Sequence, residues 1–130
     1  MRWVVAVLLA MTMPLAAEPD PEFGAQLFQD ICAACHGAEA KGGGPMSKLL
    51  TVEPPDLTKL AAENGGEFPT FRVVRQIDGR DPLLAHGGEM PLFGQLFDFP
   101  DAAIQSSSGQ PIITAQPIAD LTSWLQSVQR

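Results

Sequence analysis

The sequence predicts an all-α domain of about four helices connected by long loops. Apolar residues recur at helical spacing in several segments, and glycines and prolines separate these segments. No stretch longer than a few residues alternates apolar with polar side chains, so Ile112-Ile113 is at most a strand stub. A chain of 130 residues suits a single small domain.

The N-terminus has the pattern of an export signal. Arg2 precedes an apolar run from residue 3 to 13, and the small residues that follow suit cleavage after Ala17. The run is shorter than the about 20 residues that a membrane-spanning helix needs. We therefore predict a signal peptide over residues 1–17, a mature domain over residues 18–130 without stable membrane insertion, and a periplasmic location. An uncleaved membrane anchor is the alternative.

The first helix is predicted to begin at Asp20. Asp20 suits an N-cap, Pro21 suits the first helical position, and Glu22 suits the first turn. One apolar stripe follows at a spacing of four residues: Phe23, Leu27 and Ile31. The helix leads directly into the run Cys32-Ala33-Ala34-Cys35-His36-Gly37 and is expected to present it.

Two helices are expected in the middle of the chain. One begins near Asp56 and ends at Asn64-Gly65-Gly66, because a glycine commonly terminates a helix. The other spans Pro69 to Asp78, with Gly79 as its terminator. Its expected apolar side comprises Phe71, Val74 and Ile77.

The last helix is predicted to use Thr114 as N-cap and to run to about Gln129. Its expected buried face comprises Ile118, Leu121, Leu125 and Val128, with Trp124 alongside. The segment 95–110 has no clear periodicity, and we interpret it as mainly loop.

The strongest chemical signal is Cys-x-x-Cys-His, a c-type haem attachment signature. Thiols about one helical turn apart can each form a thioether bond with a haem vinyl group. The adjacent His36 is then placed to ligate the iron. Cys32 and Cys35 are the two cysteines of the chain, so no thiol is left for another purpose. We predict one covalently bound haem c per chain.

Three other interpretations of this motif stay open. A redox dithiol belongs in a βαβ context, which the sequence does not show. A structural zinc site needs four ligands, and besides the motif the chain offers His86 and carboxylates to complete it. The third is a chance motif in a globular domain.

The second iron ligand has three candidates in the mature chain: Met46, Met90 and His86. Met46 follows Pro45 only ten positions after His36, which favours a place near the proximal side. Met90 lies in a loop rich in glycine and proline, which can cross the far face of a ring without breaking a helix. We predict His36 and Met90 as the iron ligands. Methionine with histidine gives a higher reduction potential than two histidines would. The pair also leaves no open coordination position, which suits electron transfer.

The chain is acidic, with fifteen acidic residues against eight lysines and arginines and a net charge of −7. Such a charge argues against nucleic acid and anionic membrane surfaces as partners. It favours redox partner proteins with a basic docking patch, because complementary charge accelerates encounter. Simple solubility is the alternative explanation.

With these features in place, the sequence resembles a class I c-type cytochrome of the monohaem cytochrome c family. The resemblance covers essentially the whole mature chain and rests on the haem motif, Gly44-Pro45, Pro54-Pro55-Asp56-Leu57-Thr58, Met90-Pro91-Leu92-Phe93-Gly94 and a terminal helix with Trp124. It implies a cytochrome c-like fold in which the first and last helices cross near one haem edge. Gly24 would permit the close approach, and Phe28 would meet Trp124.

The resemblance also implies roles around the haem. The Pro45 carbonyl would accept a hydrogen bond from the outer nitrogen of His36, and Arg72 or Arg75 would neutralise a propionate. Two features depart from the family. The chain has three lysines, which puts in doubt the lysine ring that mitochondrial members use for docking, and the segment 95–110 is longer than in the smallest members.

The expected function is therefore periplasmic electron transfer by a carrier that is not an enzyme, either monomeric or a subunit of a redox complex. One alternative is a haem c subunit of a larger membrane or periplasmic oxidoreductase. The other is a haem enzyme or gas sensor with an open distal site.

Overall fold

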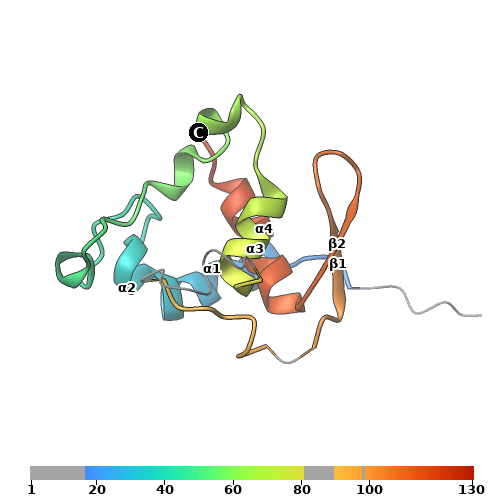
Figure 1. Cartoon of the computed structure of the whole chain (residues 1–130), viewed down its shortest axis with the longest axis horizontal. Coiled ribbons are helices and arrows are strands. Elements are labelled where there is room, and N and C mark those ends of the chain that lie inside the picture. The colour runs from blue at the N-terminus through green and yellow to red at the C-terminus, as the bar shows by residue number, and fades with distance from the viewer. Residues whose placement is uncertain (1–16, 81–89, 98) are drawn as a thin grey trace, which may run out of the picture.

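The computed structural model describes residues 17–80, 90–97 and 99–130, so the predicted signal peptide lies outside the described residues except for Ala17. Helices and helical turns are the main regular structure of the described part, which also has one two-stranded sheet (Figure 1). The elements are α1 (Pro21–Leu27), the π-helical turn η1 (Phe28–Cys32), α2 (Ala33–His36), the 3₁₀ turns η2 (Ser47–Leu49), η3 (Leu57–Lys59) and η4 (Ala62–Asn64), α3 (Thr70–Asp78), β1 (Ala102–Gln105), β2 (Pro111–Thr114) and α4 (Gln116–Ser127).

The first helix begins where the sequence predicts. The Asp20 side chain accepts hydrogen bonds from the backbone N–H groups of Glu22 and Phe23, at 2.9 and 3.1 Å. From there α1, η1 and α2 form one uninterrupted helical run that ends at His36. The start is therefore set by local capping chemistry, which a sequence displays directly.

The buried side of this run differs from the prediction. Phe23 and Ile31 are 46% and 38% exposed, whereas Gly24 and Phe28 are buried. The predicted stripe is therefore wrong by one position. The buried side is set by α4, which packs closely on the Gly24–Phe28 side of the run. The missing side chain of glycine allows the two backbones to approach there.

The crossing of α1 and α4 is the most extensive contact between two elements among the described residues. A Cβ atom on Gly24 would lie 2.1 Å from the backbone oxygen of Asp120. Next to it, the rings of Phe28 and Trp124 lie 4.5 Å apart between centroids and are tilted by 41°. The buried Asp120 carboxylate joins the two helices, because it accepts the backbone N–H of Asp20 at 2.8 Å. The crossing implied by the family resemblance is therefore confirmed.

The helix predicted from Asp56 to Gly65 is replaced by the two 3₁₀ turns η3 and η4. Its ends are as predicted, since Asp56 caps η3 and Gly65 is left-handed with φ 72°. Between them, the Gln129 side chain donates to the Leu57 carbonyl and accepts from the Ala61 N–H, both at 2.8 Å. Those two backbone groups would bond each other in an α-helix. A side chain from the far end of the chain therefore interrupts the helix.

Helix α3 agrees with the prediction in extent and end. Gly79 terminates it with φ 76°, and its N–H donates to the Arg75 carbonyl at 2.9 Å. Val74 and Ile77 are buried as expected, but Phe71 is 54% exposed. Phe71 lies on the side of α3 that faces the hairpin, under the guanidinium of Arg75 at 5.3 Å.

The hairpin of β1 and β2 corrects the all-α expectation. Ala102 pairs with Thr114 and Gln105 with Pro111 in an antiparallel register, so part of the segment 95–110 is strand. Ile112, which the sequence analysis placed in a strand stub at most, lies within strand β2 and is buried. Thr114, the predicted N-cap of the last helix, lies in β2, and the N-cap of α4 is Ala115 instead.

The expected number of about four helices is not confirmed either. Within the described residues the helical stretches longer than one turn are 21–36, 70–78 and 116–127. The predicted buried positions of the last helix are confirmed at Ile118, Leu121 and Leu125, whereas Val128 is only partly buried. Figure 1 shows α2 and the hairpin at opposite ends of the molecule, with α3 and α4 between them.

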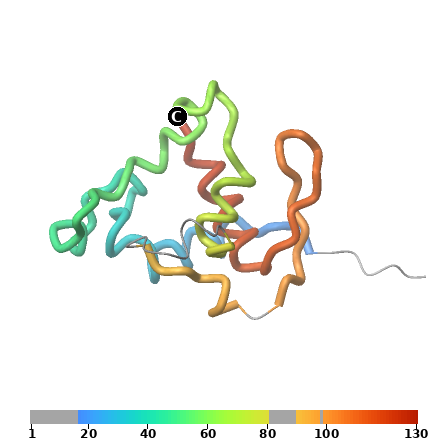
Figure 2. The backbone as a smooth tube through the Cα atoms, viewed as in Figure 1, coloured from blue at the N-terminus to red at the C-terminus, as the bar shows by residue number. Residues whose placement is uncertain are grey.

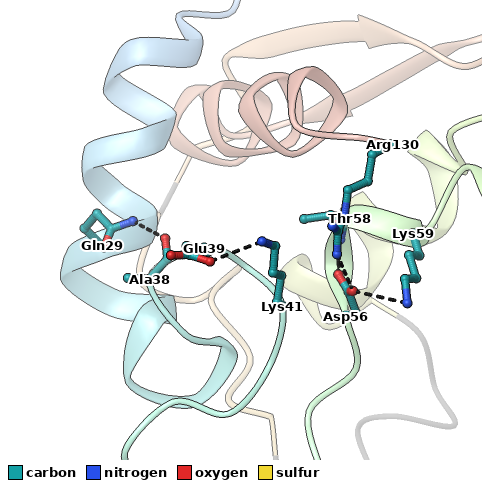
Figure 3. A network of polar contacts seen from close by, with 8 residues as sticks. All are labelled: Gln29, Ala38, Glu39, Lys41, Asp56, Thr58, Lys59 and Arg130. Carbon is teal, nitrogen blue, oxygen red and sulfur yellow. Dashed lines mark hydrogen bonds and ion pairs between the residues drawn. The ribbon is translucent and has the colours of Figure 1, made fainter.

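The C-terminal residue, Arg130, is hydrogen-bonded to the middle of the chain. Figure 2 shows it beside the segment around residue 60. The Arg130 backbone N–H donates to the Thr58 carbonyl at 3.0 Å, and its side chain contacts the Thr58 hydroxyl at 2.8 Å and Asp56 at 3.1 Å. Figure 3 shows Asp56 between Thr58, Arg130 and Lys59. This network holds the end of α4 against η3.

Replacing Asp56 with asparagine is expected to remove an acid-dependent part of the stability. The hydrogen bond from the Thr58 hydroxyl, helped by Arg130, lowers the pKa of Asp56 from 3.8 to about 2. A depressed carboxyl pKa stabilises the fold above about pH 4, and this contribution is lost as the pH falls through about 2. Urea unfolding at several pH values should show the variant less stable at neutral pH and equal to the native protein near pH 2.

The matched control is Glu63→Gln, which removes a carboxylate from the exposed surface of η4. Its unfolding curve should follow that of the native protein across the same pH range. An Asp56→Asn difference that stays constant from pH 7 to pH 2 would contradict the assigned role of the Asp56 charge.

Candidate functional site

The Cys-x-x-Cys-His motif occupies the end of the first helical run. Cys32 is the last residue of η1, and Cys35 and His36 lie in α2. The helix ends at Gly37, whose φ of 75° lies in the left-handed region that favours glycine. Helical geometry therefore places the two thiols about one turn apart and His36 directly beside the second thiol.

Both cysteines are free thiols in the structure. Burial, and to a lesser extent the neighbouring Cys35, raises the pKa of the Cys32 thiol to about 11. A redox dithiol instead needs a thiol whose pKa is lowered, because the thiolate is the reactive form. The environment of Cys32 therefore disfavours the redox-dithiol interpretation.

His36 is held in the state that suits a metal ligand. Burial lowers its pKa, so the imidazole is neutral at neutral pH, and a neutral imidazole is the form that binds metals. The ring of Phe28 lies 6.5 Å from that of His36 between centroids. The Nδ1 atom of His36 is buried and has no hydrogen-bond partner among the described residues. Buried polar atoms without partners are rare, so His36 has unused binding capacity.

The loop after the motif folds back onto it. Backbone N–H groups of Gly44 and Met46 donate to the carbonyls of Cys35 and Ala34, at 3.1 and 2.9 Å. A Cβ atom on Gly44 would lie 2.4 Å from the Ala34 oxygen, so only glycine fits there. Pro45 is thereby held next to the motif, although its carbonyl takes no hydrogen bond from Nδ1 of His36 in this structure. The predicted role of Pro45 stays a prediction.

Met46 belongs to the same side as the motif. It is 45% exposed, and its backbone is bonded to α2. Met46 thus lies beside the motif, and its expected place on the proximal side of a haem stays a prediction. His86, the other alternative ligand, lies outside the described residues.

Met90 is held by the C-terminal turn of α3. The N–H of Phe93 donates to the Ile77 carbonyl at 2.9 Å. A Cβ atom on Gly94 would lie 2.2 Å from the Asp78 backbone oxygen, so the loop approaches α3 closely at this glycine. Met90 is half-buried against the hydrophobic core, and Cys32 contacts the same core from the motif. The structure thus packs both predicted sulfur-bearing regions around one core.

Gln76 is a site residue that the sequence analysis missed. Its side-chain nitrogen donates to the Met90 sulfur at 3.9 Å, and both residues are half-buried. A glutamine on a helix is normally solvated, and Gln76 lies fourteen positions from Met90. No pattern in the sequence therefore points to this contact.

The two arginines proposed for a propionate differ in setting. Arg72 is exposed. Arg75 donates to the Arg80 carbonyl at 3.2 Å, while its Nε is buried without a partner in the described part of the chain. Arg75 also lines an open hollow of about 390 Å³ between α3 and β2, and a second hollow of about 260 Å³ lies between β1 and α4. The motif lines neither hollow, so the propionate role stays a prediction.

Two further findings concern the alternatives. Within residues 17–80, 90–97 and 99–130, no group of three or more His, Cys, Asp and Glu side chains is placed to hold a metal ion. His86, which the zinc interpretation would use, lies outside these residues. In the same residues, no helix has the length and apolar character needed to cross a membrane.

The residues present fit a haem. Two thiols and a neutral imidazole with an unpartnered nitrogen share one helical turn, and Cys32 packs against the hydrophobic core. The family model described as cytochrome c matches residues 22–129. No curated protein and no solved structure matches the chain. The matched range includes the motif, Met90 and every described helix except Pro21, the first residue of α1. Haem-based electron transfer is the general function of this family. The chain therefore belongs to the cytochrome c family.

Proposed function

We propose that this protein is a periplasmic electron carrier with one haem c, attached through Cys32 and Cys35 and ligated by His36 and Met90. The observation that carries the proposal is the helical turn that joins two free thiols to a half-buried, neutral imidazole whose Nδ1 has no hydrogen-bond partner among the described residues. A bound haem would supply one-electron ferric–ferrous chemistry, which amino-acid side chains lack.

The chain's own residues hold and shield the group. Cys32 and Cys35 would fix its edge to the motif helix, and His36 would bind from one side. The packed rings of Phe28 and Trp124 keep water away from the base of the motif. We further propose that Pro45 orients His36, because the loop bonds to α2 place it beside a histidine nitrogen that needs a partner.

Met90 would complete the coordination from the opposite side. Methionine opposite histidine favours the ferrous state. With His36 and Met90 both holding the group, no coordination position would remain for a small substrate. This saturation supports a carrier over an enzyme or gas sensor.

The sequence supports the proposed location and partner. The signal-like residues 1–17 support export to the periplasm. The net charge of −7 supports transient docking to redox proteins with a basic patch. Transient docking suits a free carrier better than a fixed subunit. Recovery of the mature protein from periplasmic extract as a soluble monomer would support this, and recovery within a stable complex would favour the subunit alternative.

An optical spectrum tests the ligand assignment. Protein produced with haem maturation machinery should show a low-spin c-type spectrum and a weak near-infrared methionine–iron band. The band should vanish in Met90→Ala and persist in Met46→Ala, a matched control whose side chain is 45% exposed. The reduced native protein should not bind carbon monoxide readily at neutral pH.

Three results would contradict the proposal. A band that survives in Met90→Ala would refute Met90 as ligand. Rapid carbon monoxide binding by the native protein would favour an open distal site. A colourless product with both thiols free would refute haem attachment itself.

A further inference from the structure

We propose that the open hollow between α3 and β2 is a docking site for an acidic segment of a partner protein. A carboxylate of that segment would bind the guanidinium of Arg75, and an apolar side chain beside it would fill the hollow. The inference goes beyond the proposed function and does not depend on the haem ligands, because neither the motif nor Met90 lines this hollow.

The hollow differs in charge from the chain as a whole. The net charge is −7, yet three of the eight lysines and arginines lie on α3 or directly after it: Arg72, Arg75 and Arg80. Two of these, Arg75 and Arg80, line the hollow, and Asp78 is the one carboxylate among its described lining residues. Because complementary charge favours association, a positive surface on an acidic protein suits an acidic partner.

Arg75 is the cation of this hollow that lacks a carboxylate partner. Arg80 forms an ion pair with Asp78, whereas no carboxylate of the described residues pairs with Arg75. One terminal nitrogen of Arg75 donates to the Arg80 carbonyl at 3.2 Å, and Nε of Arg75 is buried without a partner in the described part of the chain. A carboxylate is the acceptor that best matches the planar set of guanidinium donors. The hollow therefore offers donors to a carboxylate from outside the chain.

The hollow is formed before any partner binds. The Arg75 guanidinium lies 5.3 Å from the centroid of the Phe71 ring, and its bond to the Arg80 carbonyl fixes its direction. The two walls are joined as well, because the Thr114 hydroxyl of β2 donates to the Asp78 carboxylate of α3 at 3.2 Å. A preformed site loses less conformational entropy on binding.

The remaining lining residues favour a side chain of a partner protein over a free small molecule. Val74 and Ile112 are buried in the hollow, while Phe71 and Ile113 are 54% and 49% exposed beside them. The volume of about 390 Å³ lies near the lower end of the roughly 300–1,000 Å³ that is typical of small-molecule sites. An open hollow leaves much of a small molecule in water, whereas a partner protein covers the side chain that it inserts. Exposed apolar surface and an anchored arginine are typical of protein interfaces.

The hollow lies away from the motif. Figure 1 shows α2 at one end of the molecule and the hairpin at the other, with α3 between them. A segment bound between α3 and β2 would therefore leave the Cys-x-x-Cys-His motif uncovered. The hollow would hold the protein on an acidic partner while the motif end stays accessible to another.

Isothermal titration calorimetry of the mature haem protein tests the inference with a short synthetic peptide that alternates glutamate with phenylalanine. We expect saturable binding that weakens as the salt concentration rises. Arg75→Gln and Ile113→Ser should each weaken binding about tenfold, the loss expected for residues at the centre of an interface. Lys48→Gln and Leu49→Ser are the matched controls, because both residues are exposed on η2 beside the motif. Both controls should bind the peptide as tightly as native protein does.

Several results would overturn the inference. The native protein would fail to bind the peptide, or both hollow variants would bind it as tightly as native protein. Equal binding of a peptide with glutamine in place of glutamate would refute the role of charge. Equally tight binding of free phenylacetate, lost in Arg75→Gln, would identify a small-molecule site and refute the protein partner. If Arg75→Gln does not fold, Ile113→Ser decides, because Ile113 is 49% exposed and has no assigned role toward the haem.

Discussion

Replacing Phe28 with alanine is expected to lower the free energy of unfolding by about 3–5 kcal/mol, the usual cost of emptying a buried aromatic site. Phe28 is 1% exposed, and its ring lies 4.5 Å from that of Trp124 and 6.5 Å from that of His36 between centroids. Its removal would take away an aromatic contact as well as buried area. Since the crossing of α1 and α4 is built around this ring, the site is poorly able to collapse.

Urea unfolding of the haem protein, followed by circular dichroism, measures the effect. Phe99→Ala is the matched control, because Phe99 is 76% exposed and its truncation should change the stability by less than about 0.5 kcal/mol. Equal free energies of unfolding for Phe28→Ala and Phe99→Ala would show that the Phe28 ring at the crossing does not stabilise the fold.

Alanine at Gly24 is expected to destabilise the protein by about 3 kcal/mol, the upper end of the cost of overpacking. The added Cβ would lie 2.1 Å from the Asp120 oxygen and 2.9 Å from the Leu121 nitrogen. Both are backbone atoms, so no side-chain rotation can relieve the clash and the helices must separate. Helix propensity alone predicts the opposite sign, since alanine is favoured over glycine in a helix by about 0.5–1 kcal/mol.

Gly109→Ala provides the comparison. A Cβ atom there meets nothing within 4 Å, but φ is 78°, so the cost is limited to left-handed strain of about 1–2 kcal/mol. Thermal or urea unfolding should therefore rank Gly24→Ala as the less stable variant. A Gly24→Ala protein more stable than native would mean that α1 and α4 do not approach as closely as described.

Both substitutions also bear on the site. Because α1, η1 and α2 form one helical run, the crossing with α4 fixes the direction in which Cys35 and His36 leave the core. The Phe28 ring, which packs at this crossing, also lies 6.5 Å from the His36 ring between centroids. Loss of the crossing would therefore disturb the presentation of the motif as well as the stability.

The sequence alone determined those features that depend on neighbours in the chain. Asp20 caps a helix because its carboxylate reaches N–H groups two and three residues away. Gly79 ends α3 because glycine adopts a left-handed conformation readily. The Cys-x-x-Cys-His motif was evident for the same reason, since its chemistry depends on spacing within one helical turn.

Only the tertiary structure decided features that depend on distant partners. Gln129 enters the turn between Leu57 and Ala61 from about seventy positions away and converts a predicted helix into 3₁₀ turns. The hairpin depends on pairing between two strands of four residues each, which are too short to show a clear alternation. Gln76 meets Met90 through a folded loop. Local signals are governed by backbone and capping chemistry, whereas these contacts exist only after the chain has folded around a shared core.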